Sequence, residues 1–279
     1  MVKLNFTVNK YLLAYFVINK ANLIKNAPNN NLSISKTSQD LRQKLFLKYK
    51  NIPYFYFIYL PSLKHLEWAA ETIYVNKNDK LIQNSIKILP NEIQKIFKSI
   101  FKSAEFKRIL KQTLNYKKFV EEEWNQNKSF VFQYLEDIIG KNLPNLSVTV
   151  NVIHPSLMVG QAIPEKNLII WGHFDDWPNY TTVYLTHELL HILFNYYHIK
   201  KNNISHALIE LITDNELRIR LNKRGKYFKE DKYDIGHPYL RKLEKDILPQ
   251  WFKYLKTQKK NLILFIKQLN NKQILKKSS

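Results

Sequence analysis

The stretch "THELLHILF", residues 186–194, decides how the C-terminal half of this chain is interpreted. It sets His187 and His191 four residues apart, with Glu188 directly after the first histidine. On an α-helix four residues turn through about 400° and rise roughly 6 Å, so the two histidines lie on one face. Most of their neighbours are apolar, and burying three ionisable side chains among them is costly unless each finds a partner. The stretch therefore predicts a helix whose polar face meets a ligand.

A metal ion is the ligand that this spacing suits. Two imidazoles one helical turn apart can reach a common Zn²⁺ with bonds of about 2.0–2.1 Å. Glu188 points about 100° away from His187, a position that suits a general base acting on a zinc-bound water better than a ligand. The chain has no cysteine, so any metal must be held by His, Asp or Glu. The rival interpretation is a buried helix whose histidines bond to backbone groups or carboxylates.

A third ligand is expected from "ELITD", residues 210–214. Glu210 stands nineteen residues after His191 and could complete the ligand set. Asp214, one helical turn further, could accept the free ring N–H of a ligating histidine and fix its orientation. Three alternatives stay open for the third ligand: His206, one turn before Glu210 on the same helix, Asp214 itself, and Glu216.

"HELLH" followed by "ELITD" resembles the gluzincins, the zinc metallopeptidases that include the thermolysin-like enzymes. The resemblance covers about 30 contiguous residues strongly, and roughly residues 145–240 in the order of the elements. It implies one zinc ion per chain, held by His187, His191 and Glu210. It further implies that Glu188 is the base and that Asp214 holds a ligating histidine, His187. The metzincin family is disfavoured, because it needs Gly three and His six residues after the second motif histidine; the chain has Phe and Tyr there.

An oxyanion formed during hydrolysis needs a hydrogen-bond donor, usually Tyr or His. The loop "YDIGHPY", residues 233–239, offers Tyr233, His237 and Tyr239, and His237 is the predicted donor. A loop histidine with a structural hydrogen bond is the rival interpretation. His173 in "WGHFDDW" is a further candidate.

The pattern along the chain predicts an α+β fold. The alternating, β-branched stretch 146–154 predicts one strand, and "NLIIW", 167–171, a second strand whose edge could hold an extended peptide. Residues 158–166 are expected to connect them. Apolar residues three and four apart predict helices over 89–140, and further helices are expected over 206–223, 240–257 and 260–276. The zincin-like catalytic region would thus combine a small mixed sheet, the active-site helix and a following Glu-bearing helix, ending in C-terminal helices.

Two regions are expected, divided near Pro144. Residues 1–144 would be a mainly helical N-terminal region, which resembles no family that we can identify. Residues 145–279 would be the zincin-like metallopeptidase region. An aromatic stretch at 51–61 and a helix at 62–76 are expected within the first region.

The charge of the chain is strongly basic, with a formal net charge of +21 at pH 7. Only six of the 44 basic residues are Arg, the residue on which specific readers of bases and phosphates depend. A solvated, Lys-rich surface is therefore expected, with no specific nucleic-acid partner.

No apolar run reaches the 18 residues of a membrane span, and "YLLAYFVI" (11–18) is followed by no convincing cleavage site. A cytoplasmic location is expected by default.

The function predicted from these features is zinc-dependent hydrolysis of peptide bonds in a peptide or protein substrate. Endopeptidase and aminopeptidase activity are not distinguished by the sequence. Two alternatives belong to other classes of protein. One is a zincin-like binding or regulatory protein with little turnover, and the other is a basic, nucleic-acid-associated protein with an incidental motif.

Overall fold

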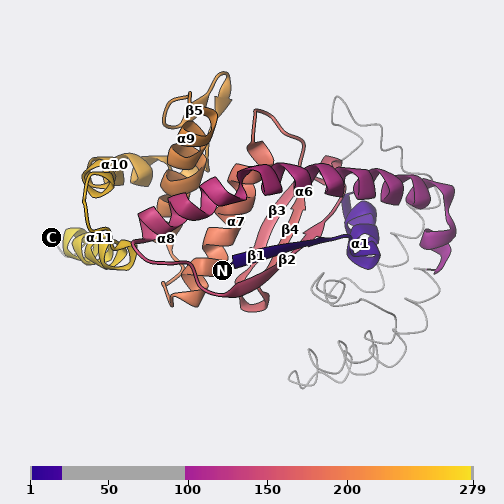
Figure 1. Cartoon of the computed structure of the whole chain (residues 1–279), viewed down its shortest axis with the longest axis horizontal. Coiled ribbons are helices and arrows are strands. Elements are labelled where there is room, and N and C mark those ends of the chain that lie inside the picture. The colour runs from indigo at the N-terminus through magenta and orange to yellow at the C-terminus, as the bar shows by residue number, and fades with distance from the viewer. Residues whose placement is uncertain (1, 21–97, 278–279) are drawn as a thin grey trace, which may run out of the picture. The chain divides into compact units, whose positions relative to one another are not determined.

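The computed structural model describes residues 2–20 and 98–277 and has an α+β fold with a small mixed sheet (Figure 1). Its described residues divide into two compact units. One unit contains residues 2–6, 119–150 and 160–277, and the other contains 7–20, 98–118 and 151–159. The predicted division at residue 144 stays a prediction.

The four-stranded sheet has the order β1-β2-β4-β3. Both strands expected from the sequence are present, as β2 and β4. All five residues of β4 are buried, which fits a continuous apolar run between two neighbouring strands. Strand β1 was not expected. The strands are β1 (Val2–Thr7), β2 (Leu146–Val152), β3 (Val159–Ile163) and β4 (Leu168–Gly172).

Strand β3 corrects two expectations. The stretch 158–166 was expected to be a connection, but its residues Val159–Ile163 form a strand at the edge of the sheet. The expected edge strand, "NLIIW", lies inside the sheet, so the prediction that its edge is open was wrong. The short, Gly-containing sequence "VGQAI" lacks the apolar run by which an interior strand is recognised, and such sequences suit sheet edges.

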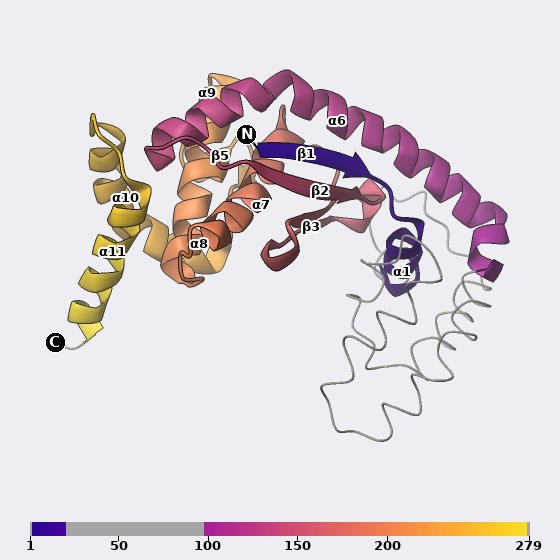
Figure 2. The ribbon, with the colours of Figure 1, turned by 60° about the horizontal axis from the view of Figure 1, so that its bottom comes forward.

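Helix α7 (Tyr180–Tyr196) carries the opening motif and packs against β4. Helix α6 (Ala104–Ile139) confirms the helical prediction for the residues that the structure describes in that region. The α6 carboxylate of Glu123 accepts hydrogen bonds from the backbone N–H and the hydroxyl of Thr182, at 2.6 and 2.7 Å. It thereby satisfies a donor in the first turn of α7. Figure 2 shows α6 running beside strand β1.

The next helix runs through three segments, α8 (Asn203–Glu210), the π-helical η4 (Leu211–Leu217) and α9 (Arg218–Asn222). It starts three residues before the predicted helix, because Asn202 and Ser205 form a capping box. The π-helical segment was not predicted.

The C-terminal part confirms the two Lys-rich helices, α10 (Arg241–Leu255) and α11 (Leu262–Lys277). Before them, β5 (Lys229–Glu230) and β6 (Tyr233–Asp234) form a small antiparallel hairpin, followed by the 3₁₀ turn η5 (Pro238–Leu240). No helix within the described ranges is both long enough and apolar enough to cross a membrane.

The second unit contains α1 (Lys10–Lys20), the start of α6 and the 3₁₀ turn η2 (Pro155–Leu157). Helix α1 packs against η2, and the side chain of Asn9 accepts hydrogen bonds from the first N–H groups of α1. The stretches expected at 51–61 and 62–76, and the first residues of the helical region from 89, lie outside the described residues.

Candidate metal centre

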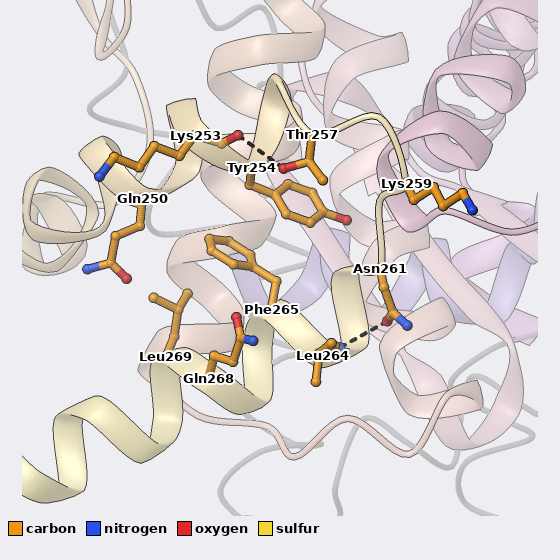
Figure 3. Close-up of a pocket in the computed structure, with 10 residues that line it drawn as sticks. All are labelled: Gln250, Lys253, Tyr254, Thr257, Lys259, Asn261, Leu264, Phe265, Gln268 and Leu269. Atoms are coloured by element: carbon orange, nitrogen blue, oxygen red, sulfur yellow. Dashed lines mark hydrogen bonds between the residues drawn. The ribbon is translucent and has the colours of Figure 1, made fainter.

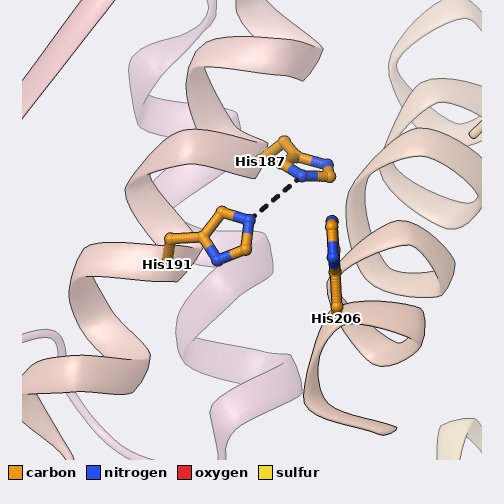
Figure 4. A group of neighbouring side chains, drawn as sticks. All are labelled: His187, His191 and His206. Atoms are coloured by element: carbon orange, nitrogen blue, oxygen red, sulfur yellow. Dashed lines mark hydrogen bonds between the residues drawn. The ribbon is translucent and has the colours of Figure 1, made fainter. Parts of the chain in front are cut away.

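Three histidines from two helices face a common space (Figure 4). His187 and His191 come from α7, His206 comes from α8, and one ring nitrogen of each lies within 4.8 Å of the others. The Nε2 atoms of His187 and His191 are 3.3 Å apart. Two nitrogen ligands of a tetrahedral zinc ion, with bonds of about 2.0–2.1 Å, are separated by roughly 3.3–3.4 Å. The spacing of this pair therefore fits a shared zinc ion.

Asp214 orients the first of these histidines. Its Oδ1 lies 2.9 Å from Nδ1 of His187 and also accepts a hydrogen bond from the Thr213 hydroxyl at 2.8 Å. With Nδ1 held in this way, Nε2 of His187 is directed towards His191. Burial lowers the pKa of His187, but the charge and hydrogen bond of Asp214 outweigh it, so the pKa rises to about 9. The structure thus brings together the two residues expected to form this pair.

Glu210 is fully buried and is bound on both oxygens by His237. Its Oε1 lies 2.5 Å from Nδ1 of His237, and its Oε2 accepts the backbone N–H of the same residue at 2.9 Å. Gly236, with φ of +81°, permits this approach, because a Cβ there would lie 2.3 Å from Oε2. A carboxylate oxygen of Glu210 lies within 4.8 Å of ring nitrogens of His206 and His237, and it is not grouped with the motif histidines. The distance from its Oε1 to Nε2 of His206 is 3.8 Å. Glu210 therefore stands beside the three-histidine group and stays a predicted ligand.

The ring of His206 has a nitrogen available for a metal. Its Nε2 is buried and has no hydrogen-bond partner among the described residues, while its Nδ1 lies 3.3 Å from the hydroxyl of Tyr239. Burial, helped by the charges of neighbouring histidines, lowers the pKa of His206 to about 4. The imidazole is therefore neutral at pH 7. A buried, neutral ring nitrogen that the described residues leave without a partner is suited to bind a metal, and the ring nitrogens of His187 and His191 beside it could bind the same ion.

Glu188 lies next to the histidines without joining either group of potential ligands. Its buried carboxylate accepts the backbone N–H of Ala162 in β3, and burial raises its pKa. A carboxylate with a raised pKa can take up and release a proton closer to neutral pH. This position fits the predicted base.

A cavity of about 760 Å³ contains the centre. His237 faces it with half of its side chain exposed, and Tyr239 lies at its rim, so the structure brings the predicted donor to the site. Sequence reasoning missed the contribution of β3, because "VGQAI" carries only a weak strand pattern. The cavity is lined by Gly160, Gln161, Ala162, Pro164, Glu165, His187, Glu188, His191, Phe194, Asn195, Ile199, Lys201, Asn202, Asn203, Ser205, His206, Ile209, His237 and Tyr239.

Three other sequence candidates lie elsewhere. The carboxylate of Glu216 is bound by Arg220, at 2.6 Å, and by the Tyr227 hydroxyl. His173 bonds to its neighbour's carbonyl and stacks on Tyr180, away from the residues that line the cavity. Tyr233 belongs to the β5–β6 hairpin and does not line the cavity either.

Two side chains that bond to backbone carbonyls of the helix hold the π-helical segment, and Asp214 within it, in place. The Asn215 amide donates to the carbonyl of Glu210 at 3.0 Å and accepts the N–H of Phe228 at 2.6 Å. The buried guanidinium of Arg218 donates to the carbonyl of Asp214 at 2.8 Å and pairs with Glu230. Both contacts tie the helix to the segment that leads to His237. The sequence signal was a run of polar residues, "TDN", within a buried helix.

A second cavity, of about 360 Å³, lies between α10 and α11 (Figure 3). Tyr254 and Phe265 stack in it with ring centroids 4.6 Å apart. The described residues that line it include no His, Asp or Glu, so they offer none of the ligands that the first cavity provides. Its lining consists of Gln250, Lys253, Tyr254, Thr257, Lys259, Asn261, Leu264, Phe265, Gln268 and Leu269.

Comparison with protein-family models, with curated proteins and with solved structures finds no match to this chain.

Proposed function

We propose that this protein is a zinc-dependent peptidase whose centre is the cavity containing His187, His191 and Glu188. The observation that carries the proposal is the pair His187 and His191, whose Nε2 atoms are 3.3 Å apart. The other ring nitrogen of His187, Nδ1, is held by the buried carboxylate of Asp214. This approach of two nitrogens, one on the buried His187 and one on the half-buried His191, matches the spacing of two ligands on one zinc ion. The neighbouring buried carboxylate of Glu188 supplies the base that hydrolysis requires.

Glu210 is the third ligand in this proposal, beside His187 and His191. A carboxylate offsets part of the charge of a divalent cation in a largely buried site, which three neutral imidazoles do not. The resemblance to gluzincins favours the same assignment, as does the hydrogen bond that the Asp214 carboxylate accepts from His187. The grouping of donor atoms favours His206 instead, and a zinc titration of variants separates the two.

A bound zinc ion would supply a Lewis acid that polarises the substrate carbonyl and acidifies water. Glu188 accepts the proton of the attacking water and delivers it to the leaving nitrogen. His237 donates a hydrogen bond to the oxyanion from its half-exposed ring. The hydrogen bond to Glu210 raises the pKa of His237, so its ring holds a proton more firmly than a free histidine. Strand β3, at the sheet edge along the cavity, offers backbone groups to an extended peptide.

A second candidate function follows from the closeness of His206 and Glu210, whose Nε2 and Oε1 are 3.8 Å apart. If both side chains bind zinc together with the two motif histidines, four protein ligands close the site to water. Such a centre is structural, and it would belong to a binding or regulatory protein with little turnover.

The test combines metal analysis with a change of the base. Protein purified without chelator should contain about one zinc ion per chain. Glu188→Gln should keep the zinc and lose peptide hydrolysis, because only the proton acceptor is removed. Glu122→Gln, an exposed change on α6, is the matched control and should keep activity. A protein that cannot be loaded with zinc would refute the proposal, and zinc without any hydrolysis would favour the closed centre.

A further inference from the structure

The cavity extends beyond the metal-binding side chains to the turn that joins α7 and α8. Helix α7 ends because His198 adopts a left-handed conformation, with φ of +54°, and the N–H of Ile199 bonds back to the carbonyl of Phe194 at 2.8 Å. The chain then needs only a few residues to reach the start of α8 at Asn203. This short connection places side chains of the α7–α8 turn at one end of the cavity.

Three polar side chains at this end are available to a ligand. Asn195, Lys201 and Asn203 line the cavity, and within the described ranges their side chains make no hydrogen bond or ion pair. Their neighbours Asn202 and Ser205 differ, because both are engaged in the capping box of α8. The available donors are thus an ammonium group and two amides.

The charge of this end is positive. Lys201 is the one Lys or Arg among the described residues that line the cavity, whereas the acidic lining consists of Glu165, in the β3–β4 connection, and Glu188. At the start of α8 the capping box engages the N–H of Ser205, and the N–H of His206 makes the first intrahelical bond, to the carbonyl of Asn202. The N–H groups of the residues between Asn202 and Ser205 precede this bond and add positive potential.

We infer that the preferred substrates are peptides that carry a carboxylate near the scissile bond, received by Lys201 together with Asn195 and Asn203. This inference rests on the proposed peptidase function. An ammonium group and amide N–H groups are donors that a carboxylate accepts, and charge-assisted hydrogen bonds are the stronger ones. The buried side chains of Phe194 and Ile209 line the same cavity and give the aliphatic part of an acidic side chain an apolar surface. The carboxylate can belong to Asp or Glu or to the free C-terminus of a peptide.

The substrate preference is measured with matched peptides. The zinc-loaded full chain is first incubated with a mixed peptide library to find sequences that it cleaves. Each cleaved sequence is then made with Glu or Gln at positions near the cut, and with a free or amidated C-terminus. The carboxylate form should be cleaved with a kcat/KM about fivefold higher, which is the upper range for one exposed ion pair. A difference in kcat/KM between the Glu and Gln peptides identifies a side-chain carboxylate, and a difference between the free and amidated peptides identifies the C-terminus.

Charge reversal tests the role of Lys201 itself. Lys201→Glu should invert the preference, so that the amide form, or a peptide with Lys in place of Glu, becomes the better substrate. Lys200→Glu is the matched control, since this exposed neighbour lies outside the cavity, and it should keep the preference of the unchanged protein. An inverted ratio cannot arise from partial unfolding, because unfolding lowers both rates alike.

The outcomes separate the two proposals. Cleavage without a carboxylate preference, or a preference that survives Lys201→Glu, would overturn this inference and leave the peptidase intact. Failure of the zinc-loaded protein to cleave any library peptide would refute the peptidase and this inference with it.

Discussion

Asp214→Asn is the change that tests the histidine pair most directly. Asparagine has the shape of aspartate, and its amide oxygen can keep the bonds from His187 and Thr213 that Oδ1 now accepts. The negative charge is lost. The amide nitrogen takes the place of Oδ2, which is buried and finds no hydrogen-bond partner in the part of the chain that the structure describes. The variant therefore separates the charge of Asp214 from its shape.

The size of the effect follows from two opposing terms. Partners that hold a ligating histidine contribute about 10–100-fold to metal affinity, or about 1.4–2.8 kcal/mol at 1.4 kcal/mol per factor of ten. Against this, the charge of Asp214 raises the pKa of His187 to about 9, so at pH 7 a proton competes with zinc for Nε2. The variant is freed from that competition. Its loss of zinc affinity should therefore be about 10–100-fold at pH 9 and clearly smaller at pH 7.

The assay is a competition titration with a chromophoric chelator, performed at pH 7 and at pH 9. Asp246→Asn, an exposed change on α10, is the control and should match the unchanged protein at both pH values. The variant should also unfold more easily, by about 1–3 kcal/mol, because a buried amide N–H is left without an acceptor. Equal affinity of variant and unchanged protein at pH 9, or a larger deficit at pH 7 than at pH 9, would refute the reasoning.

Three further predictions concern the third ligand, the oxyanion donor and the N-terminus of α7. Glu210→Ala should release most of the zinc in a dialysis experiment while His206→Ala retains it, and the reverse result would assign His206 as the ligand. His237→Ala should lower kcat while the zinc content stays near one per chain, and a kcat unchanged in steady-state kinetics would remove it from the mechanism. Burial and the charge of Asp175 raise the pKa of Glu123 to about 7. Between about pH 4.5 and 7 the folded protein therefore keeps a proton on Glu123 that the unfolded chain releases, so the free energy of unfolding falls as the pH rises through this range. Glu123→Gln should remove that fall and raise stability at pH 8 by on the order of 1–3 kcal/mol, and urea midpoints that shift equally at pH 5 and pH 8 would contradict it.

The elements around the site could be predicted from the sequence where local pattern decides the structure. The alternation in 146–154 and the apolar run in "NLIIW" predicted β2 and β4, and the spacing of His187 and His191 predicted one face of α7. The contact between His187 and Asp214 was also expected, because the resemblance to gluzincins implies it.

The features that were missed depend on contacts between distant residues. Strand β3 has a weak pattern of its own and is a strand because it pairs with β4. The orientation of Glu210 is set by His237, which lies 27 residues later in the chain, so no local rule predicts it. The same holds for His206, whose approach to the motif histidines depends on how α8 packs against α7.

The π-helical segment Leu211–Leu217 has a consequence for how this chain can vary in length. Relative to an α-helix, a π turn accommodates an extra residue, and removing one residue would let the helix revert to the regular form. The residues after the segment would then keep their orientation about the helix axis, whereas the same deletion from a regular α-helix would rotate them by about 100°. Arg218 would still face Glu230, so the hairpin would keep its anchor on the helix, and the cost would be the contacts of the wide turn, such as the bond from Asn215 to the carbonyl of Glu210. A single-codon deletion should therefore be tolerated better within this segment than in α8 or α7, where it would turn the residues of the site away from one another.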